Sequence, residues 1–525
     1  MTAAFDFSRL KSVADISRIH AAERPHATAL DFNDRITTYK QLDSRASQVA
    51  NGLIALGQKP DARVGYLGKN TDRYFEVLLG AFKARCVIVG VNWRLAAPEI
   101  AYVLNDAGCE VLFVGAPFYD TIAKILPECP KLKTIVAMDG GRADWSAYEQ
   151  WRDAQSATDP MLPNAPDDDV IQLYTSGTTG HPKGVQITDA NYLALFNILP
   201  DKGLIRYSPD DVVLIAMPFF HVAGVNLGLA SLAQGCTGIV LGETDPQEIL
   251  RLIEAKRITR AFLVPALILF LIQQKNVGEF DLSTLQSILY GASPIADDVL
   301  LKAKDILGCA FEQVYGLTET TGAGTHLPAA DHAPSRGKLR SCGKPVGGHD
   351  IRIVDGEGNP LPPGEVGEIC IRAANVMKGY WNRPDATAKA VVDSWFHTGD
   401  AGYFDEEGYL YIHDRVKDMI VSGGENVYPA EVENAIFGHP DVADVAVIGV
   451  PDEKWGEAVK AIVVAKQGAS PTPAEIIAWA RERIAGYKLP KSVDFIAALP
   501  RNPTGKVLRR ELRKPYWEGR DRQVN

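Results

Sequence analysis

Short apolar runs alternate with helical patterns through residues 1–330. A short run of branched and aromatic residues predicts a buried strand, and an apolar stripe of period 3.6 predicts an amphipathic helix. On these rules we expect strands at 63–70, 110–115, 211–218, 237–242 and 261–266, and helices at 75–84 and 246–257. Alternation of strands and helices favours α/β layers built on a largely parallel sheet.

The pattern changes near residue 340. Residues 348–372 alternate apolar and polar positions between Asp-Gly, Asn-Pro and Pro-Pro-Gly turns, which predicts β-hairpins and a small β subdomain. After Asp414 the chain predicts a compact α+β unit, with helices at 429–440 and 473–485 and strands at 442–451 and 458–466. We therefore expect a large N-terminal domain with mixed or parallel sheets over 1–414 and a small C-terminal domain over 415–525.

One long stretch, residues 212–242, contains no Asp, Glu, Lys or Arg. By length alone it could span a bilayer. It nevertheless includes His221, Asn226, Gln234 and several glycines. A buried strand–loop–helix–strand is therefore the favoured interpretation, and we expect no integral membrane segment.

Composition narrows the classes of partner. The net charge of −10 argues against nucleic acid, whose binding draws on an excess of basic residues. Seven cysteines without a CxxC pair argue against a disulfide framework or a cysteine zinc site. Residues 1–20 lack the apolar run of a signal peptide. We expect a cytoplasmic protein, with a homodimer left open.

The strongest local signal is the segment 174–184, Tyr-Thr-Ser-Gly-Thr-Thr-Gly-His-Pro-Lys-Gly, which follows a predicted strand. Its glycines allow backbone N–H groups to converge on phosphate oxygens, while hydroxyls and a lysine add donors and positive charge. The segment is not the common P-loop, in which Gly precedes the lysine and Ser or Thr follows it. A flexible surface loop is the alternative. The candidate phosphate-binding residues are Thr175, Ser176, Gly177, Thr178, Thr179, Gly180 and Lys183.

Six further motifs follow in order, at 217–224, 290–294, 314–320, 397–400, 414–433 and 500–512. Together with the segment 174–184, they resemble the signatures of the adenylate-forming superfamily, which contains acyl-CoA synthetases, firefly luciferases and the adenylation domains of peptide synthetases. The similarity covers nearly the whole chain. It implies that ATP activates a carboxylic acid as an acyl-adenylate and that coenzyme A then accepts the acyl group.

The resemblance implies roles for the reacting centre. Attack of a carboxylate on the α-phosphate brings two anions together, so positioned positive charge is the main requirement. Lys506 would contact the carboxylate and the α-phosphate, although a solvated lysine is the alternative. Glu319 would hold Mg²⁺ with Thr175 as the second ligand, because Mg²⁺ prefers carboxylate and phosphate oxygens. Thr318 would contact the phosphate.

The same resemblance implies the rest of the nucleotide site. Asp400 would accept hydrogen bonds from the ribose hydroxyls, and Arg415 would add a ribose or phosphate contact. Tyr315 would stack on the adenine, although a core tyrosine is the alternative. The other nucleotide-lining candidates are Gly291, Ala292, Ser293, Pro294 and Gly316.

The acyl pocket and the coenzyme A half-reaction follow in the same way. His221, Gly224, Val225, Tyr290, Gly316 and Leu317 would line the acyl pocket, with plain core packing as the alternative for His221. The small domain is expected to be mobile and to rotate about a hinge at Lys417 after adenylation. It would then bring to the site the coenzyme A candidates Ser422, Gly423, Gly424, Glu425, Lys488 and Lys491.

The substrate is narrowed by absences in the sequence. An amino acid would need an acidic partner for its ammonium group, and 212–242 contains none. We therefore expect an acid with an uncharged apolar tail, either medium- or long-chain fatty or aryl. Gly224 and Val225 occupy the place where some long-chain enzymes carry a Trp gate. The rivals are a ligase that loads a carrier protein, a luciferase-like oxygenase and a non-catalytic regulator.

Overall fold

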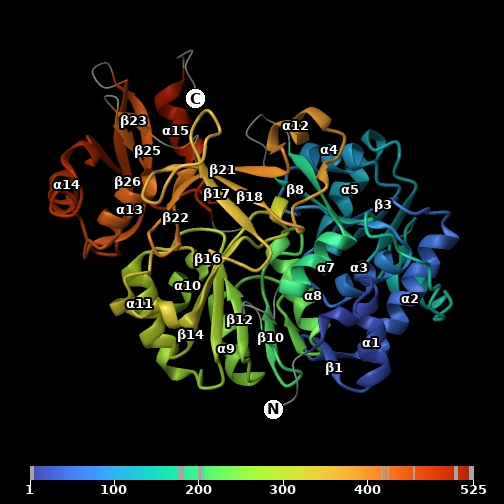
Figure 1. Cartoon of the computed structure of the whole chain (residues 1–525). Coiled ribbons are helices and arrows are strands. Elements are labelled where there is room, and N and C mark those ends of the chain that lie inside the picture. Colours follow the sequence, from blue (N-terminus) through green and yellow to red (C-terminus); the bar gives the residue numbers. More distant parts are fainter. Residues whose placement is uncertain are drawn as a thin grey trace.

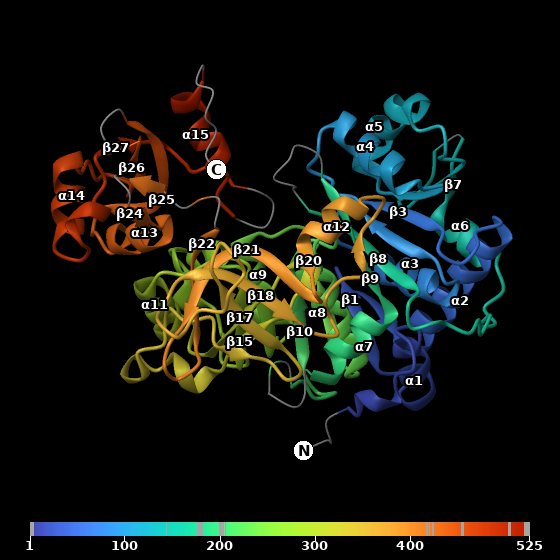
Figure 2. The ribbon, with the colours of Figure 1, turned by 45° about the horizontal axis from the view of Figure 1, so that its top comes forward.

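The structure is a computed structural model that describes residues 5–142, 144–175, 182–198, 204, 206–415, 418, 420–422, 425–452, 456–501 and 506–518. The chain folds into a large body and a smaller C-terminal lobe, seen in red at one side of the body in Figure 1. In the turned view the lobe lies over the half of the body that contains α11, away from the N-terminal helices (Figure 2).

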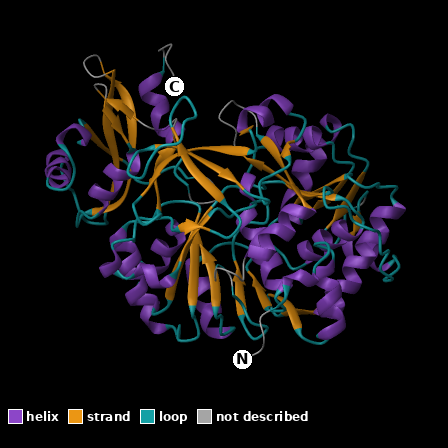
Figure 3. Ribbon diagram, viewed as in Figure 1, coloured by secondary structure: helices purple, strands orange, loops and turns teal. Residues whose placement is uncertain are grey.

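One sheet of the body runs through its central and C-terminal part, with helices against its strands (Figure 3). Five neighbouring strand pairs in this sheet are parallel: β1 with β11, β11 with β10, β10 with β12, β12 with β13, and β13 with β14. The spatial order is β16 (Lys344–Pro345), β15 (Thr325–Leu327), β14 (Ala310–Tyr315), β13 (Ser287–Gly291), β12 (Arg260–Leu263), β10 (Val212–Ile215), β11 (Thr237–Val240), β1 (Thr28–Phe32) and β2 (Arg35–Thr38).

A second sheet occupies the N-terminal part of the body. Its centre is parallel, and β8, β9 and β19 extend it with antiparallel pairs. The order is β19 (Gly379–Tyr380), β9 (Lys183–Thr188), β8 (Asp169–Thr175), β4 (Val87–Gly90), β3 (Arg63–Leu67), β5 (Val111–Val114), β6 (Thr134–Ala137) and β7 (Ser146–Ala147). The strands expected at 63–70, 110–115, 211–218, 237–242 and 261–266 are thus present.

The helices of the body begin where the sequence supplies caps. Thr38 and Gln41 form a capping box at the start of α2, and Asp245 caps α9 with Pro246 in its first turn. The helices are α1 (Asp15–Glu23), α2 (Tyr39–Ala55), α3 (Arg73–Lys83), α4 (Ala97–Ala107), α5 (Tyr119–Ile125), α6 (Tyr148–Asp153), α7 (Asp189–Ile198), α8 (Val222–Ala233), α9 (Pro246–Ala255), α10 (Pro265–Ile272), α11 (Asp297–Leu307) and α12 (Pro384–Ala390).

The charge-free stretch 212–242 forms β10, α8 and β11, as the sequence predicted. α8 packs inside the body so closely that a Cβ on Gly228 would lie 2.1 Å from the Phe75 ring. Burial in the protein core therefore explains why this stretch lacks charges. Among the helices that the structure describes, none is both long and apolar enough to cross a bilayer.

The predicted β subdomain is a small antiparallel sheet that lies between the two halves of the body in Figure 1. It consists of β17 (Asp350–Val354), β18 (Gly367–Arg372), β21 (Trp395–Phe404), β20 (Val391–Val392) and β22 (Leu410–Arg415). β22 extends to Arg415, which pairs with Asp400. The last strand of this sheet therefore ends beside the expected boundary between residues 414 and 415, which stays a prediction.

The C-terminal lobe has its own apolar core, and it contains both a sheet and helices, in agreement with its expected α+β character. Its sheet contains β24 (Glu425–Val427), β23 (Ile420–Ser422), β26 (Gly456–Ala465), β25 (Val442–Asp452) and β27 (Ser492–Phe495). Its helices are α13 (Pro429–Phe437), α14 (Pro473–Arg481) and α15 (Arg509–Trp517). The division of the chain into these two domains is our interpretation of the separate cores.

Candidate active site

Two paired strands, β8 and β9, flank the candidate phosphate segment. β8 ends at Thr175 and β9 begins at Lys183, and these two residues are the last cross-strand pair before the turn. Ser176, Gly177, Thr178, Thr179 and Gly180 lie outside the described residues. The strand-to-strand connection differs from a P-loop, in which the loop leads into a helix. The anchors of the segment are thus held by backbone pairing on both sides.

A chain of contacts connects this hairpin to the candidate magnesium ligand. Glu319 lies on a short 3₁₀ turn, Thr318–Thr320, and is buried. The Tyr380 hydroxyl donates a hydrogen bond of 2.9 Å to Glu319 Oε1. The Lys183 ammonium lies 4.8 Å from the centre of the Tyr380 ring, and Tyr380 pairs with Val185 of β9. The structure therefore brings Thr175, Lys183 and Glu319 into one neighbourhood.

The oxygen donors in this neighbourhood fit Mg²⁺. A buried carboxylate and a threonine hydroxyl are hard ligands, which this cation prefers when phosphate oxygens complete its shell. Glu319 Oε2 is the carboxylate oxygen that Tyr380 does not use in the hydrogen bond above. Glu319 and Thr175 are therefore the residues that would hold the ion, and the ion would neutralise phosphate charge.

The candidate ribose ligand Asp400 is buried beside Tyr315. The Tyr315 hydroxyl donates a hydrogen bond of 2.9 Å to Asp400 Oδ2, and both side chains are less than 10% exposed, at 9% and 8%. Burial and the nearby Asp400 carboxylate raise the pKa of Tyr315 well above its ordinary value, so the phenol remains a donor. The structure thus gives Tyr315 a buried position with a polar contact, and its stacking on the adenine stays a prediction beside the alternative of a core tyrosine.

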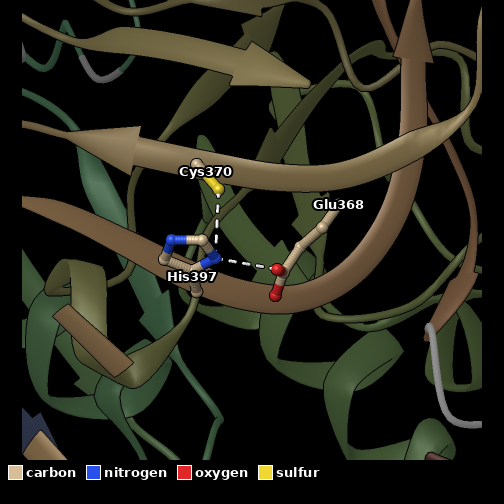
Figure 4. A group of neighbouring side chains, drawn as sticks. All are labelled: Glu368, Cys370 and His397. Carbon is tan, nitrogen blue, oxygen red and sulfur yellow. Dashed lines mark hydrogen bonds and ion pairs between the residues drawn. The ribbon is translucent and has the colours of Figure 1, made fainter. Parts of the chain in front are cut away.

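Asp400 is presented by a bulge in β21. Cys370 and Glu368 of β18 pair with His397 and Ala401, so residues 398–400 bulge out of the ladder. Glu368 Oε1 accepts a hydrogen bond of 3.0 Å from the Gly399 N–H. The other carboxylate oxygen, Oε2, lies 2.8 Å from His397 Nδ1, and Figure 4 shows this contact. Glu368 therefore anchors the bulge that carries the candidate ribose ligand.

The candidate adenine-lining segment follows β13, where the parallel strands β13 and β14 both end. This carboxyl edge is where α/β sheets commonly bind ligands. A Cβ on Gly291 would lie 2.4 Å from the Val314 carbonyl oxygen, and one on Gly316 would lie 2.4 Å from the Gly322 carbonyl carbon. Ala292 has a φ of +69°. The glycines are therefore required by close backbone contacts, and Ser293 and Pro294 continue the same loop.

The acyl-pocket candidates lie near the start of α8. His221 precedes the helix, and its Nε2 atom is buried without a hydrogen-bond partner among the described residues. Burial, with a smaller effect of Arg94, lowers the pKa of His221 to about 3, so the imidazole is neutral near pH 7. An unpartnered buried nitrogen is costly, and a substrate oxygen could satisfy it.

Two other acyl-pocket candidates have clear packing roles. A Cβ on Gly224 would lie 2.4 Å from the Pro218 carbonyl oxygen, so the first turn of α8 admits no side chain there. Tyr290 is fully buried, with its hydroxyl 3.0 Å from His332 Nε2 and 3.2 Å from Gln313 Oε1. The structure therefore gives Tyr290 a packing role, and its place in the acyl pocket stays a prediction. Val225 is also fully buried, and Leu317 is partly buried against the core.

The candidates of the C-terminal lobe are only partly described. Lys506 is half-buried, next to Val507, which pairs with Arg501. Ser422 is buried in β23. Lys417, Gly423 and Gly424 lie outside the described residues, and only the backbone course of Arg415 and Glu425 is described, in β22 and β24.

The two lysines proposed for coenzyme A have different surroundings. Lys488 contacts both carboxylate oxygens of Glu431, at 2.6 and 2.8 Å. Burial lowers the pKa of Lys488, and the Glu431 carboxylate more than offsets that effect, so the pKa is raised overall. Lys491 is exposed. Lys488 therefore already has a strong anionic partner within the lobe.

Sequence reasoning missed Tyr380 and Glu368. Tyr380 is the hydroxyl donor to Glu319, and Glu368 anchors the turn before Asp400. Both lie in segments that read as ordinary strand or turn, so no local pattern marked them. The one available signal for Glu368 was its place on a strand that could pair with the motif at 397–400.

Comparisons with known proteins identify the family of the chain. Residues 18–381 match the family described as AMP-binding enzyme, and residues 431–506 match the AMP-binding enzyme C-terminal domain. The chain is 41% identical to a fatty acid–[acyl-carrier-protein] ligase of Streptomyces coeruleorubidus, over 98% of this chain and 99% of that protein. It is 40% identical to a feruloyl-CoA synthase of an Amycolatopsis species, over 94% and 96%.

A solved structure is similar over nearly the whole fold. It is an anthranilate CoA ligase in complex with anthranoyl-AMP, with a TM-score of 0.90 and 27% identity over 97% of this chain and 99% of that one. The chain therefore belongs to the AMP-binding enzyme family, whose members form adenylates. Within that family it is an AMP-forming acid–thiol ligase, as the resemblance in sequence implied.

Proposed function

We propose that this enzyme converts a carboxylic acid with an apolar tail, ATP and coenzyme A into acyl-CoA, AMP and pyrophosphate. The observation that carries the proposal is the grouping of Thr175, Lys183 and Glu319. Thr175 pairs with Lys183, Lys183 lies over the Tyr380 ring, and Tyr380 donates a hydrogen bond to Glu319. This grouping supplies the cation, hydroxyl and carboxylate that a triphosphate and its metal ion require.

In the first half-reaction a carboxylate oxygen of the acid attacks the α-phosphorus, and pyrophosphate leaves. Lys183 and the N–H groups of its loop would bind the triphosphate, and Asp400 would orient the ribose. Lys506 would offset the charge of the two reacting anions. In the second half-reaction the thiol of coenzyme A attacks the acyl carbon, AMP leaves, and the thiol proton goes to solvent.

Two observations support an apolar tail for the acid. No acidic side chain occurs in 212–242, and the neutral His221 imidazole carries no charge. An ammonium or second carboxylate would be left without a partner there. The names of the relatives reported above refer to fatty and aryl acids, which is consistent with this class of substrate.

A panel of acids tests the proposal. Medium-chain, long-chain and aryl acids are incubated with ATP, Mg²⁺ and coenzyme A, and AMP release is measured. We expect thioester formation with free coenzyme A. Acylation of a carrier protein in place of coenzyme A would favour the rival ligase, oxygen uptake with light would favour the luciferase-like rival, and the absence of AMP with every acid would contradict the proposal.

The role of Lys506 is tested by separating the two half-reactions. Lys506→Ala should abolish pyrophosphate release and leave thioester formation from pre-made acyl-adenylate largely intact. Lys417→Pro should do the reverse, because it restricts the hinge that we propose between the two domains. An equal loss of both half-reactions in Lys506→Ala would contradict its assignment.

We also propose a cytoplasmic location and leave a homodimer to be tested by light scattering. All seven cysteines lie in the described part of the chain as free thiols, which supports a reducing compartment.

A further inference from the structure

Glu368, Cys370 and His397 offer three different ligand atoms at one point of the small β sheet (Figure 4). His397 Nδ1 lies 2.8 Å from Glu368 Oε2 and 3.4 Å from Cys370 Sγ. All three ligand atoms lie within 4.8 Å of one another. Among the residues that the structure describes, no other three His, Cys, Asp or Glu side chains are grouped in this way.

We propose that Glu368, Cys370 and His397 bind a zinc-class divalent cation and that this cation weakens ATP binding. A thiolate, an imidazole and a carboxylate are the ligand types that Zn²⁺ selects. Regular tetrahedral coordination would separate these ligand atoms by about 3.4 to 3.6 Å, given typical zinc–ligand lengths. The observed 2.8 and 3.4 Å require only small outward movements.

The sheet holds the ligands in place before any cation binds. Cys370 and His397 are direct cross-strand partners, and Glu368 lies two residues before Cys370 on the same face of β18. The side chains of His397 and Glu368 are 23% and 28% exposed, so a cation can enter from solvent and retain a water as its fourth ligand. The thiol proton passes to the buffer when the sulfur coordinates.

Arg352 adds a positive charge near Cys370. Arg352 is itself engaged with Trp395, with its guanidinium carbon 4.1 Å from the ring centre. A bound Zn²⁺ would offset the charges of the carboxylate and the thiolate, leaving one net positive charge with Arg352.

The site is coupled to Asp400 through Glu368. One oxygen of this carboxylate would bind the cation while the other accepts from the Gly399 N–H, in the bulge that presents Asp400. An outward movement of Glu368 would therefore displace the bulge. This coupling rests on the proposed ribose-binding role of Asp400, whereas the binding of the cation does not.

Binding is tested with Co²⁺, which takes zinc sites and gives a sulfur-to-cobalt charge-transfer band in the near ultraviolet. Untagged wild-type enzyme should show this band with saturation at one equivalent, and Zn²⁺ should remove it. Cys370→Ser should lack the band. Glu368→Gln, which preserves the shape of the side chain, should bind on the order of tenfold more weakly or worse. Cys309→Ser is the matched control and should behave as wild type.

Coupling is tested by initial rates of pyrophosphate release at saturating acid. Zn²⁺ should raise the KM for ATP of wild type and of Cys309→Ser but not of Cys370→Ser. An equal cobalt band in wild type and Cys370→Ser would overturn the site. A normal band with an unchanged KM would overturn the coupling alone. If the cobalt band is normal but no adenylate forms under any condition, the proposed function is refuted and the cation site is not.

Discussion

Acidification should destabilise the body through His221, and the structure gives the sign and size of this effect. The folded-state pKa of His221 is about 3, below its ordinary value of 6.5, because the ring is buried. A group with a lowered folded pKa binds its proton more tightly in the unfolded chain. Its contribution to stability is therefore fully present above pH 6.5 and is lost progressively as the pH falls toward 3.

The expected magnitude follows from these two pKa values. Between pH 7.5 and pH 5, linkage predicts a loss of about 2 kcal/mol in the free energy of unfolding from this single residue. Asp189 acts in the opposite direction. Burial raises the pKa of Asp189 to about 6, so its contribution is present at low pH and is lost as the pH rises from 3.8 through 6. The pH profile of wild type alone would mix the two effects.

The comparison of His221→Gln with wild type isolates the histidine. Urea unfolding at pH 7.5 and pH 5 is followed by tryptophan fluorescence, and the transition of the body is fitted separately from that of the lobe. Asp189 contributes equally to both proteins, so the difference between their pH dependences reports His221. We expect wild type to lose about 2 kcal/mol more than the variant. Equal pH dependences would show that His221 titrates normally and would refute the burial argument.

Two further predictions concern polar partners. Tyr380→Phe removes the hydrogen bond to Glu319, which as a bond to a charged group contributes about 1.5 to 3 kcal/mol. The rate of pyrophosphate release should fall about tenfold or more, with thioester formation from pre-made acyl-adenylate unchanged, and equal slowing of both steps would contradict a role at the metal ligand. Lys488→Ala should lower the stability of the lobe without changing the KM for coenzyme A, because Glu431 already pairs with that lysine. A raised KM would support the sequence-based assignment of Lys488 to the coenzyme A site.

The sequence by itself determined the fold class, the order of the main strands and the family. Strands such as β3 and β10 were predictable because their apolar residues must be buried wherever they lie, and caps such as Asp245 mark helix starts locally. The motifs at 174–184 and 397–400 were visible because each carries its chemistry within a few consecutive residues.

Only the tertiary structure decided which of these residues meet. Tyr380 and Glu319 are 61 positions apart, and Tyr315 and Asp400 are 85 apart, so their hydrogen bonds depend on strand register across different sheets. The same dependence placed Tyr290 in the core and brought Cys370 opposite His397. Local pattern determines whether a side chain is buried, whereas its partner depends on which distant strand lies beside it, because a shift of one residue turns a side chain to the other face.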